Sequence, residues 1–184
     1  WEHERQDAQT YAEWGFDYLK YDWCSYVRMA GGDRLKHMMR PYLVMSDALR
    51  AQPRDILLSI CQYGMAHVSA WGRQAGGHCW RTTPDIVDTW ESMIQIADAQ
   101  DGLEPFAGPG GWNDPDMLVV GTVGWGEPHP TRLTPNQQYT HFSLWCLLNA
   151  PLLLGCDLSR LDAFTLGLLA NDEVIAVNQD PLGR

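Results

Sequence analysis

Basic residues are scarce in this chain of 184 residues, which has 13 lysines and arginines against 23 aspartates and glutamates and a net charge of −10 at pH 7. Nucleic acids and anionic membranes both require a basic protein surface, so this balance argues against binding to either. No apolar run approaches the ~20 residues that a membrane helix needs. The chain is nevertheless 45% hydrophobic with nine tryptophans, which is typical of a globular protein and favours a neutral or poorly charged substrate.

Cysteines are also few, and they show no metal-binding pattern. The five cysteines, at positions 24, 61, 79, 146 and 156, lack the spacing of metal ligands, and their odd number leaves at least one unpaired. The six histidines show no zinc-site pattern. The G-x-S-x-G motif that an α/β-hydrolase would need is absent. The sequence therefore predicts no metal and no cofactor, and it argues against that class of hydrolase.

A charged pair ends a short apolar strand near the N-terminus. Lys20 and Asp22 are two residues apart, so alternation along a strand places both on one face, with Tyr21 on the other. A cation beside a carboxylate lowers the pKa of that carboxylate and keeps it ionised, as a nucleophile requires. An ordinary ion pair at the end of a strand is the alternative interpretation.

A second carboxylate follows another predicted strand, Cys79–Thr82. Pro84 interrupts this strand, and Asp85 comes directly before the helical pattern of residues 86–99. Asp is strongly preferred as a helix N-cap, which is the alternative to a catalytic role for Asp85. The two roles are compatible, because catalytic groups in α/β barrels lie where strands give way to helices.

A third segment, residues 108–117, is rich in glycine, proline and aspartate. Trp112 could stack on a sugar face or pack inside a barrel, and Asp114 and Asp116 flank a proline. A calcium loop is a further alternative. Calcium takes six to eight oxygen ligands, and this run supplies few besides its carboxyl and amide groups.

Four segments together resemble glycoside hydrolase family 27, the family of α-galactosidases and α-N-acetylgalactosaminidases. They are DYLKYD at residues 17–22, WRTTPDI at 80–86, GGWNDPDM at 110–117 and NQDPLG at 178–183, and they follow the order of the family across nearly the whole chain. The resemblance implies a retaining glycosidase that acts through a covalent glycosyl-enzyme. Asp22 then matches the nucleophile and Asp85 the acid/base, in enzymes that hold these two carboxyl groups about 5–5.5 Å apart.

The resemblance also implies which residues bind the sugar. Lys20, Arg81 and Asp116 match positions that hydrogen-bond its hydroxyls, and Trp112 lies beside them in the third motif. A structural ion pair of Arg81 with Asp116 or Asp85 is the alternative. Gln62 replaces a glutamate in the segment that sets tolerance at the 2-position of the sugar. Since an amide can donate as well as accept, the choice among an α-galactosidase, an α-N-acetylgalactosaminidase and a β-L-arabinopyranosidase stays open.

Predicted strands and helices alternate along the chain, which favours parallel strands with crossover helices. Five strands are expected, at residues 16–21, 56–61, 79–82, 111–113 and 151–155, with helices at 4–14, 35–50, 68–74, 86–99, 136–148 and 161–169. A (β/α)₈ barrel has eight strands in about 250 residues. The resemblance implies that residues 1–184 form part of one catalytic α/β barrel domain, roughly strands four to eight, without its first three strands and the C-terminal β-sandwich.

The remaining expectations concern partners and environment. The resemblance implies an α-galactoside substrate, a secreted, periplasmic or lysosomal location, and a disulfide from Cys24 to a residue upstream of this sequence. Residues 16–19 and 152–154 would be open strand edges. Exposed edges promote association, so the chain is expected to need the missing residues, a partner chain or a homo-oligomer for stability. A fragment that binds sugar without cleaving it is the rival to an active enzyme.

Overall fold

The computed structural model describes residues 2–24, 34–124, 126–180 and 182 of the chain. Pro181 and Gly183 of the fourth motif lie outside these described residues. The chain divides into two compact units, residues 1–82 and residues 83–184. No helix of the described part is long and apolar enough to cross a membrane.

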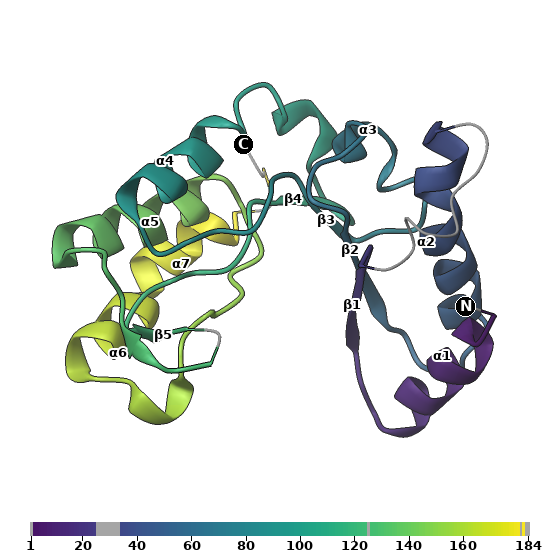
Figure 1. Ribbon diagram of the computed structural model, residues 1–184, viewed down its shortest axis with the longest axis horizontal. Helices are drawn as coiled ribbons and strands as arrows, with labels where there is room; N and C mark the ends of the chain where they lie inside the picture. Colours follow the sequence, from purple (N-terminus) through teal and green to yellow (C-terminus); the bar gives the residue numbers. More distant parts are fainter. Residues whose placement is uncertain (1, 25–33, 125, 181, 183–184) are drawn as a thin grey trace. The chain divides into compact units, whose positions relative to one another are not determined.

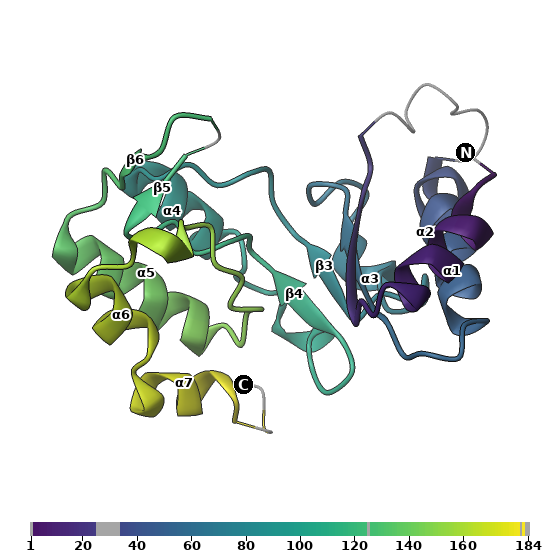
Figure 2. The same cartoon turned by 90° about the horizontal axis from the view of Figure 1, so that it is seen from below.

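The first unit contains three parallel strands, β1 (Tyr18–Asp22), β2 (Leu57–Cys61) and β3 (Cys79–Arg81), with β2 in the middle. In this register Asp22, the last residue of β1, lies opposite Cys61, the last residue of β2. Helices α1 (Glu4–Glu13) and α2 (Arg34–Arg50) lie side by side against the sheet, and α3 (Val68–Trp71) follows β2 (Figures 1 and 2). The carboxyl ends of the strands therefore lie next to one another.

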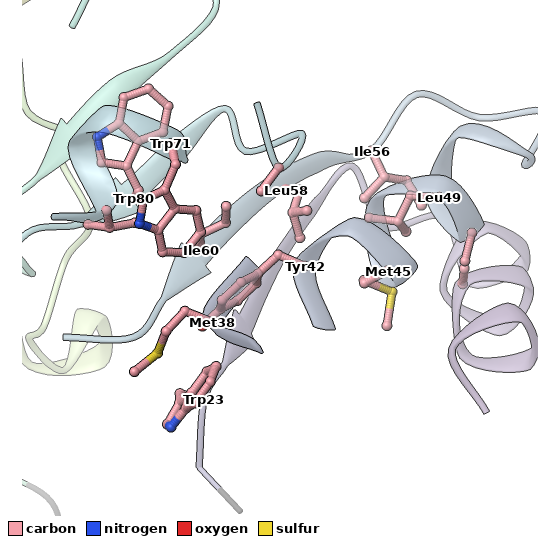
Figure 3. Close-up of a cluster of buried hydrophobic side chains, with 14 residues drawn as sticks. Trp23, Met38, Tyr42, Met45, Leu49, Ile56, Leu58, Ile60, Trp71 and Trp80 are labelled. Atoms are coloured by element: carbon pink, nitrogen blue, oxygen red, sulfur yellow. The ribbon is translucent and has the colours of Figure 1, made fainter. Parts of the chain in front are cut away.

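An apolar stripe on α2 forms the core of this unit. Met38, Tyr42, Met45 and Leu49 recur at helical spacing, and this face packs on the buried side of β2, as Figure 3 shows. Tyr42 also donates a hydrogen bond of 2.9 Å from its hydroxyl to the carbonyl of Cys61. The packing thus fixes the end of β2, where the chain turns toward the candidate site.

The second unit is built mainly from helices. Helix α5 (Pro135–Leu147) packs against α4 (Trp90–Asp98), α6 (Ala163–Leu169) and α7 (Asp172–Asn178). Residues Met93, Leu118, Phe142 and Trp145 form its core. The short strand β4 (Trp112–Asp114) lies in the third motif. Strand β5 (Thr122–Val123) pairs antiparallel with β6 (His129–Pro130). Two 3₁₀ turns, η2 (Glu104–Phe106) and η3 (Leu158–Arg160), complete the unit's described elements.

Several predicted elements need correction. The helix expected from residue 86 begins only at Trp90, because Thr89 caps it and accepts the backbone N–H of Ser92. The expected strand at residues 151–155 makes only an isolated parallel bridge, between Leu118 and Leu154. Helix α7 and the β5–β6 pair were not predicted. The other strands and helices are confirmed, with their ends shifted by a few residues.

Candidate active site

Asp22 lies at the carboxyl end of β1, which is where parallel α/β sheets present their functional groups. Lys20 and Asp22 are both exposed and Tyr21 is half-buried, so the predicted alternation along this strand is confirmed. The backbone N–H of Trp23 donates to the carbonyl of Cys61 over 2.8 Å and continues the pairing of the two strands. The position of Asp22 is therefore set by the sheet.

Tyr63 is the main hydrogen-bond partner of the Asp22 carboxylate. Its hydroxyl donates to Oδ1 of Asp22 over 2.6 Å, and the backbone N–H of Cys24 donates to the same oxygen over 3.4 Å. Partial burial would raise the pKa of Asp22, but hydrogen bonds from Tyr63, Cys24 and Cys61 outweigh it and hold this pKa below its usual value. The lowered pKa predicted from the sequence is confirmed. These donors, with Tyr63 first, lower the pKa most, and the predicted contribution of Lys20 stays a prediction.

A loop of unusual backbone conformation carries Tyr63. The φ angles of Tyr63, Ala66 and His67 are 64°, 55° and 53°, in the left-handed region that side chains other than glycine rarely adopt. The side chain of Gln62 is fully buried and donates to the carbonyl of Met65, and the indole of Trp71 donates to the carbonyl of Ala66 over 2.8 Å. These buried contacts hold the loop in the conformation that places Tyr63 on Asp22.

Gln62 has thus a structural role that the sequence did not indicate, since its amide N–H group closes the loop. Its predicted role at the sugar stays a prediction. Tyr63 is the residue that sequence reasoning missed. One feature of the sequence could have indicated it. Tyr63 follows Gln62, and Gln62 comes directly after a strand whose last residue lies opposite Asp22.

Arg81 completes this set at the end of β3. Its side chain is buried, with Nη1 3.9 Å from Sγ of Cys61 and the guanidinium carbon 6.0 Å from the centre of the Tyr63 ring. The backbone N–H of Gly64 donates to the Arg81 carbonyl over 3.1 Å. Burial raises the pKa of Cys61 to about 12, although Lys20 and Arg81 oppose this, so the thiol is neutral at physiological pH. Cys61 is therefore not a thiolate nucleophile.

In the second unit, Asp85 is exposed on the segment before α4. The N-cap of α4 is Thr89, four residues further along the chain. The alternative of Asp85 as a helix cap is therefore wrong.

Asp116 anchors the segment that carries Asp85. Its buried carboxylate accepts the backbone N–H of Ile86 at Oδ2 and that of Met117 at Oδ1, each over 2.8 Å. The indole of Trp145 donates to the Asp116 carbonyl over 2.6 Å, and Asp116 itself has a φ of 92°. Asp116 thus links the residue after Asp85 to the end of β4.

The other candidates are placed as follows. Trp112 is half-buried at the start of β4, which leaves stacking and packing both open. Within the described ranges, no three His, Cys, Asp or Glu side chains gather as a metal site requires. None of the five cysteines forms a disulfide with another described residue, and the implied partner of Cys24 is not in this sequence, so its disulfide stays a prediction. The first unit therefore holds Lys20, Asp22, Gln62 and Arg81, and the second holds Asp85, Trp112 and Asp116.

The family model described as Alpha galactosidase A matches residues 1–180. The chain belongs to this family. It is 47% identical to Alpha-galactosidase 2 of Arabidopsis thaliana over 181 residues, which are 98% of this chain and 42% of that protein. Among solved structures, it is similar to alpha-galactosidase I of Mortierella vinacea, with a TM-score of 0.86, 30% identity, and coverage of 98% of this chain and 48% of the other.

A further solved structure, the Saccharomyces cerevisiae alpha-galactosidase with raffinose, matches with a TM-score of 0.80 and 29% identity over 98% of this chain and 42% of that chain. The predicted fold class is confirmed: the chain is part of a (β/α)₈ barrel of this family, with parallel strands. It spans less than half the length of these relatives.

Proposed function

We propose that this chain supplies the catalytic carboxylates of a retaining α-galactosidase, as one part of a barrel domain whose first strands and C-terminal β-sandwich lie outside residues 1–184. The observation that supports this best is Asp22, placed at the end of a parallel strand and held ionised by Tyr63. An ionised carboxylate at this position is what a glycosidase nucleophile requires. The relative solved with raffinose, an α-galactoside, supports the substrate class.

The reaction proceeds in two steps. Asp22 attacks the anomeric carbon, and Asp85 protonates the departing oxygen, which leaves a β-linked galactosyl ester on Asp22. Asp85, now ionised, takes a proton from water, which attacks the same carbon. The bond to Asp22 breaks with its electron pair returning to the carboxylate. Two inversions give net retention of configuration.

The other candidate residues bind the sugar. Lys20 and Arg81 offer only donors and Asp116 only acceptors, so together they serve both roles of a sugar hydroxyl. Trp112 contributes an apolar face, and Gln62 shapes the loop near the 2-position. A site that pairs each hydroxyl rejects an epimer strongly, because the wrong epimer leaves buried groups unsatisfied.

The test uses the complete gene product that contains this chain. Asp22→Ala should abolish hydrolysis of an aryl α-galactoside, and azide should restore part of the turnover by forming the β-galactosyl azide. Asp17→Ala is the matched control, because Asp17 precedes the other end of β1 and pairs with Arg54 at 2.6 Å. Turnover close to wild type in Asp22→Ala would refute the proposal. A wild-type protein that binds galactose without hydrolysis would favour the binding-only rival.

A further inference from the structure

The contact between Tyr63 and Asp22 is directed at one carboxylate oxygen. The phenol hydroxyl and the backbone N–H of Cys24 both donate to Oδ1. Tyr63 is half-buried, and its ring lies over the guanidinium of Arg81. The hydroxyl at 2.6 Å is a short donor to an ionised acceptor, which is the stronger class of hydrogen bond.

The protein maintains this contact against a backbone preference. Tyr63 adopts a left-handed conformation, and the buried Gln62 amide and the Trp71 indole hold the loop around it. Strained backbone that the surrounding structure fixes in this way is concentrated at functional sites. A phenylalanine would fill the same space and keep the ring over Arg81, so the hydroxyl is the part that the packing does not explain.

We propose that Tyr63 is a positioning residue that reserves Oδ2 of Asp22 for attack on the anomeric carbon and stabilises the carboxylate when the glycosyl-enzyme breaks down. This inference rests on the proposed function. In the covalent intermediate Oδ2 carries the sugar, and Oδ1 is the carbonyl oxygen of the ester, still within reach of Tyr63.

The two chemical steps differ in their dependence on this hydrogen bond. When the ester forms, negative charge leaves the carboxylate, so the hydrogen bond to Oδ1 weakens and gives the step no assistance. When water displaces the sugar, the carbon–Oδ2 bond breaks, charge returns to the carboxylate, and the hydrogen bond strengthens toward the transition state. Tyr63 therefore accelerates breakdown of the intermediate in particular.

Other titratable groups also face Asp22, and they set the background for its ionisation. They are the thiols of Cys24 and Cys61 and, from α2, the hydroxyl of Tyr42. Burial raises the pKa of Tyr42 above its usual value, and the hydrogen bond to Asp22 raises that of Tyr63, so both hydroxyls stay protonated. Removing the Tyr63 hydroxyl should therefore raise the pKa of Asp22 and move the acidic limb of kcat/KM to higher pH.

The test compares wild type, Tyr63→Phe and Tyr18→Phe in the complete gene product, with an aryl α-galactoside whose leaving group needs little protonation. Tyr18 is the matched control, because its part-buried hydroxyl contacts Sγ of Cys79 at 3.2 Å at the other end of β1. Tyr63→Phe should lower kcat about tenfold or more, in line with loss of a hydrogen bond to a charged group. KM should fall with kcat, kcat/KM above the acidic limb should be largely kept, and glycosyl-enzyme should accumulate in the mass spectrum.

The outcomes separate the inference from the proposed function. A wild-type protein without α-galactosidase activity would refute the proposed function itself. If the wild type is active, two results would overturn the role of Tyr63 alone. One is a Tyr63→Phe variant with the same kinetic constants as wild type. The other is a variant with a raised KM and no accumulated glycosyl-enzyme. A Tyr63→Phe protein that no longer melts cooperatively would overturn this role as well, because the hydroxyl would then be required by the fold.

Discussion

The carboxylate of Asp116 accepts a hydrogen bond of 2.8 Å from the backbone N–H of Ile86, the residue that follows Asp85 in the chain. Since Asp116 also accepts from Met117 and its carbonyl accepts from Trp145, it connects the Asp85 segment to the core of the second unit. An acid/base group needs such a fixed backbone, because proton transfer depends on geometry before it depends on pKa.

Asp85→Ala should damage substrates with poor leaving groups far more than activated aryl galactosides. General acid catalysis contributes about 10²–10⁴-fold, and only a poor leaving group needs all of it. The measurement is kcat/KM for the complete gene product over a series of leaving groups. Thr89→Ala is the control: it should cost about 1 kcal/mol of stability through loss of the α4 cap, with no dependence on the leaving group. Equal damage by Asp85→Ala to all substrates would contradict the assignment.

Asp88 should make the free energy of unfolding fall more steeply as the pH is lowered. It is buried and receives hydrogen bonds from Nε and Nη2 of Arg132, at 3.1 and 2.6 Å. Burial would raise the pKa of Asp88, but the bonds from Arg132 outweigh it and lower this pKa. A lowered folded-state pKa stabilises the fold above about pH 3.9, the usual value for Asp, and this stabilisation is lost as pH falls through the folded-state value.

The measurement is urea unfolding of wild type and Asp88→Asn between pH 2 and 7. Wild type should be more stable near neutrality, and this advantage should shrink on acidification. Asp47→Asn is the control, because Asp47 is exposed and lies 3.7 Å from Arg50. An advantage of wild type that stays constant down to pH 2 would contradict the role of Asp88.

Strand β1 should make the isolated chain prone to association. Among the described residues it pairs only with β2, so one parallel edge has no strand beside it. Light scattering should show oligomers or aggregates of the 184-residue chain, and extension by upstream residues of the gene product should give a monomer. The second predicted edge, residues 152–154, makes only a single bridge. An isolated chain that is monomeric, melts cooperatively and hydrolyses α-galactosides at ordinary rates would refute this.

Local patterns predicted most of the framework. Alternating apolar runs and breakers identified β1, β2 and β3, and helical spacing identified α2 and α5. The same reasoning failed at residues 151–155, because an apolar run after a proline reads as a buried strand although only Leu154 forms a bridge. It placed the start of α4 too early, because Ile86 fits the helical period although Thr89 supplies the cap.

The sequence predicted those residues of the candidate site that belong to its motifs, but not the long-range contacts between them. Asp22 and Asp85 follow strands or breakers that the sequence displays. The contact between Tyr63 and Asp22 joins residues 41 apart and depends on a left-handed turn at a tyrosine, which no propensity indicates. The double anchoring by Asp116 likewise depends on a hydrogen bond across 30 residues. Long-range partners of this kind determine which group lowers a pKa most, and the sequence by itself indicates only the near neighbour of Asp22, Lys20.

Covalent trapping at Asp22 tests the central claim most directly. A fluorinated galactosyl fluoride with an activated leaving group should form the ester on the enzyme faster than water can release it. Peptide mass spectrometry of the complete gene product should then find the sugar on the peptide that contains residues 17–24, on Asp22. The label should disappear in Asp22→Ala and persist longest in Tyr63→Phe. A label on any other carboxylate, or an active enzyme that forms no covalent adduct, would contradict the account.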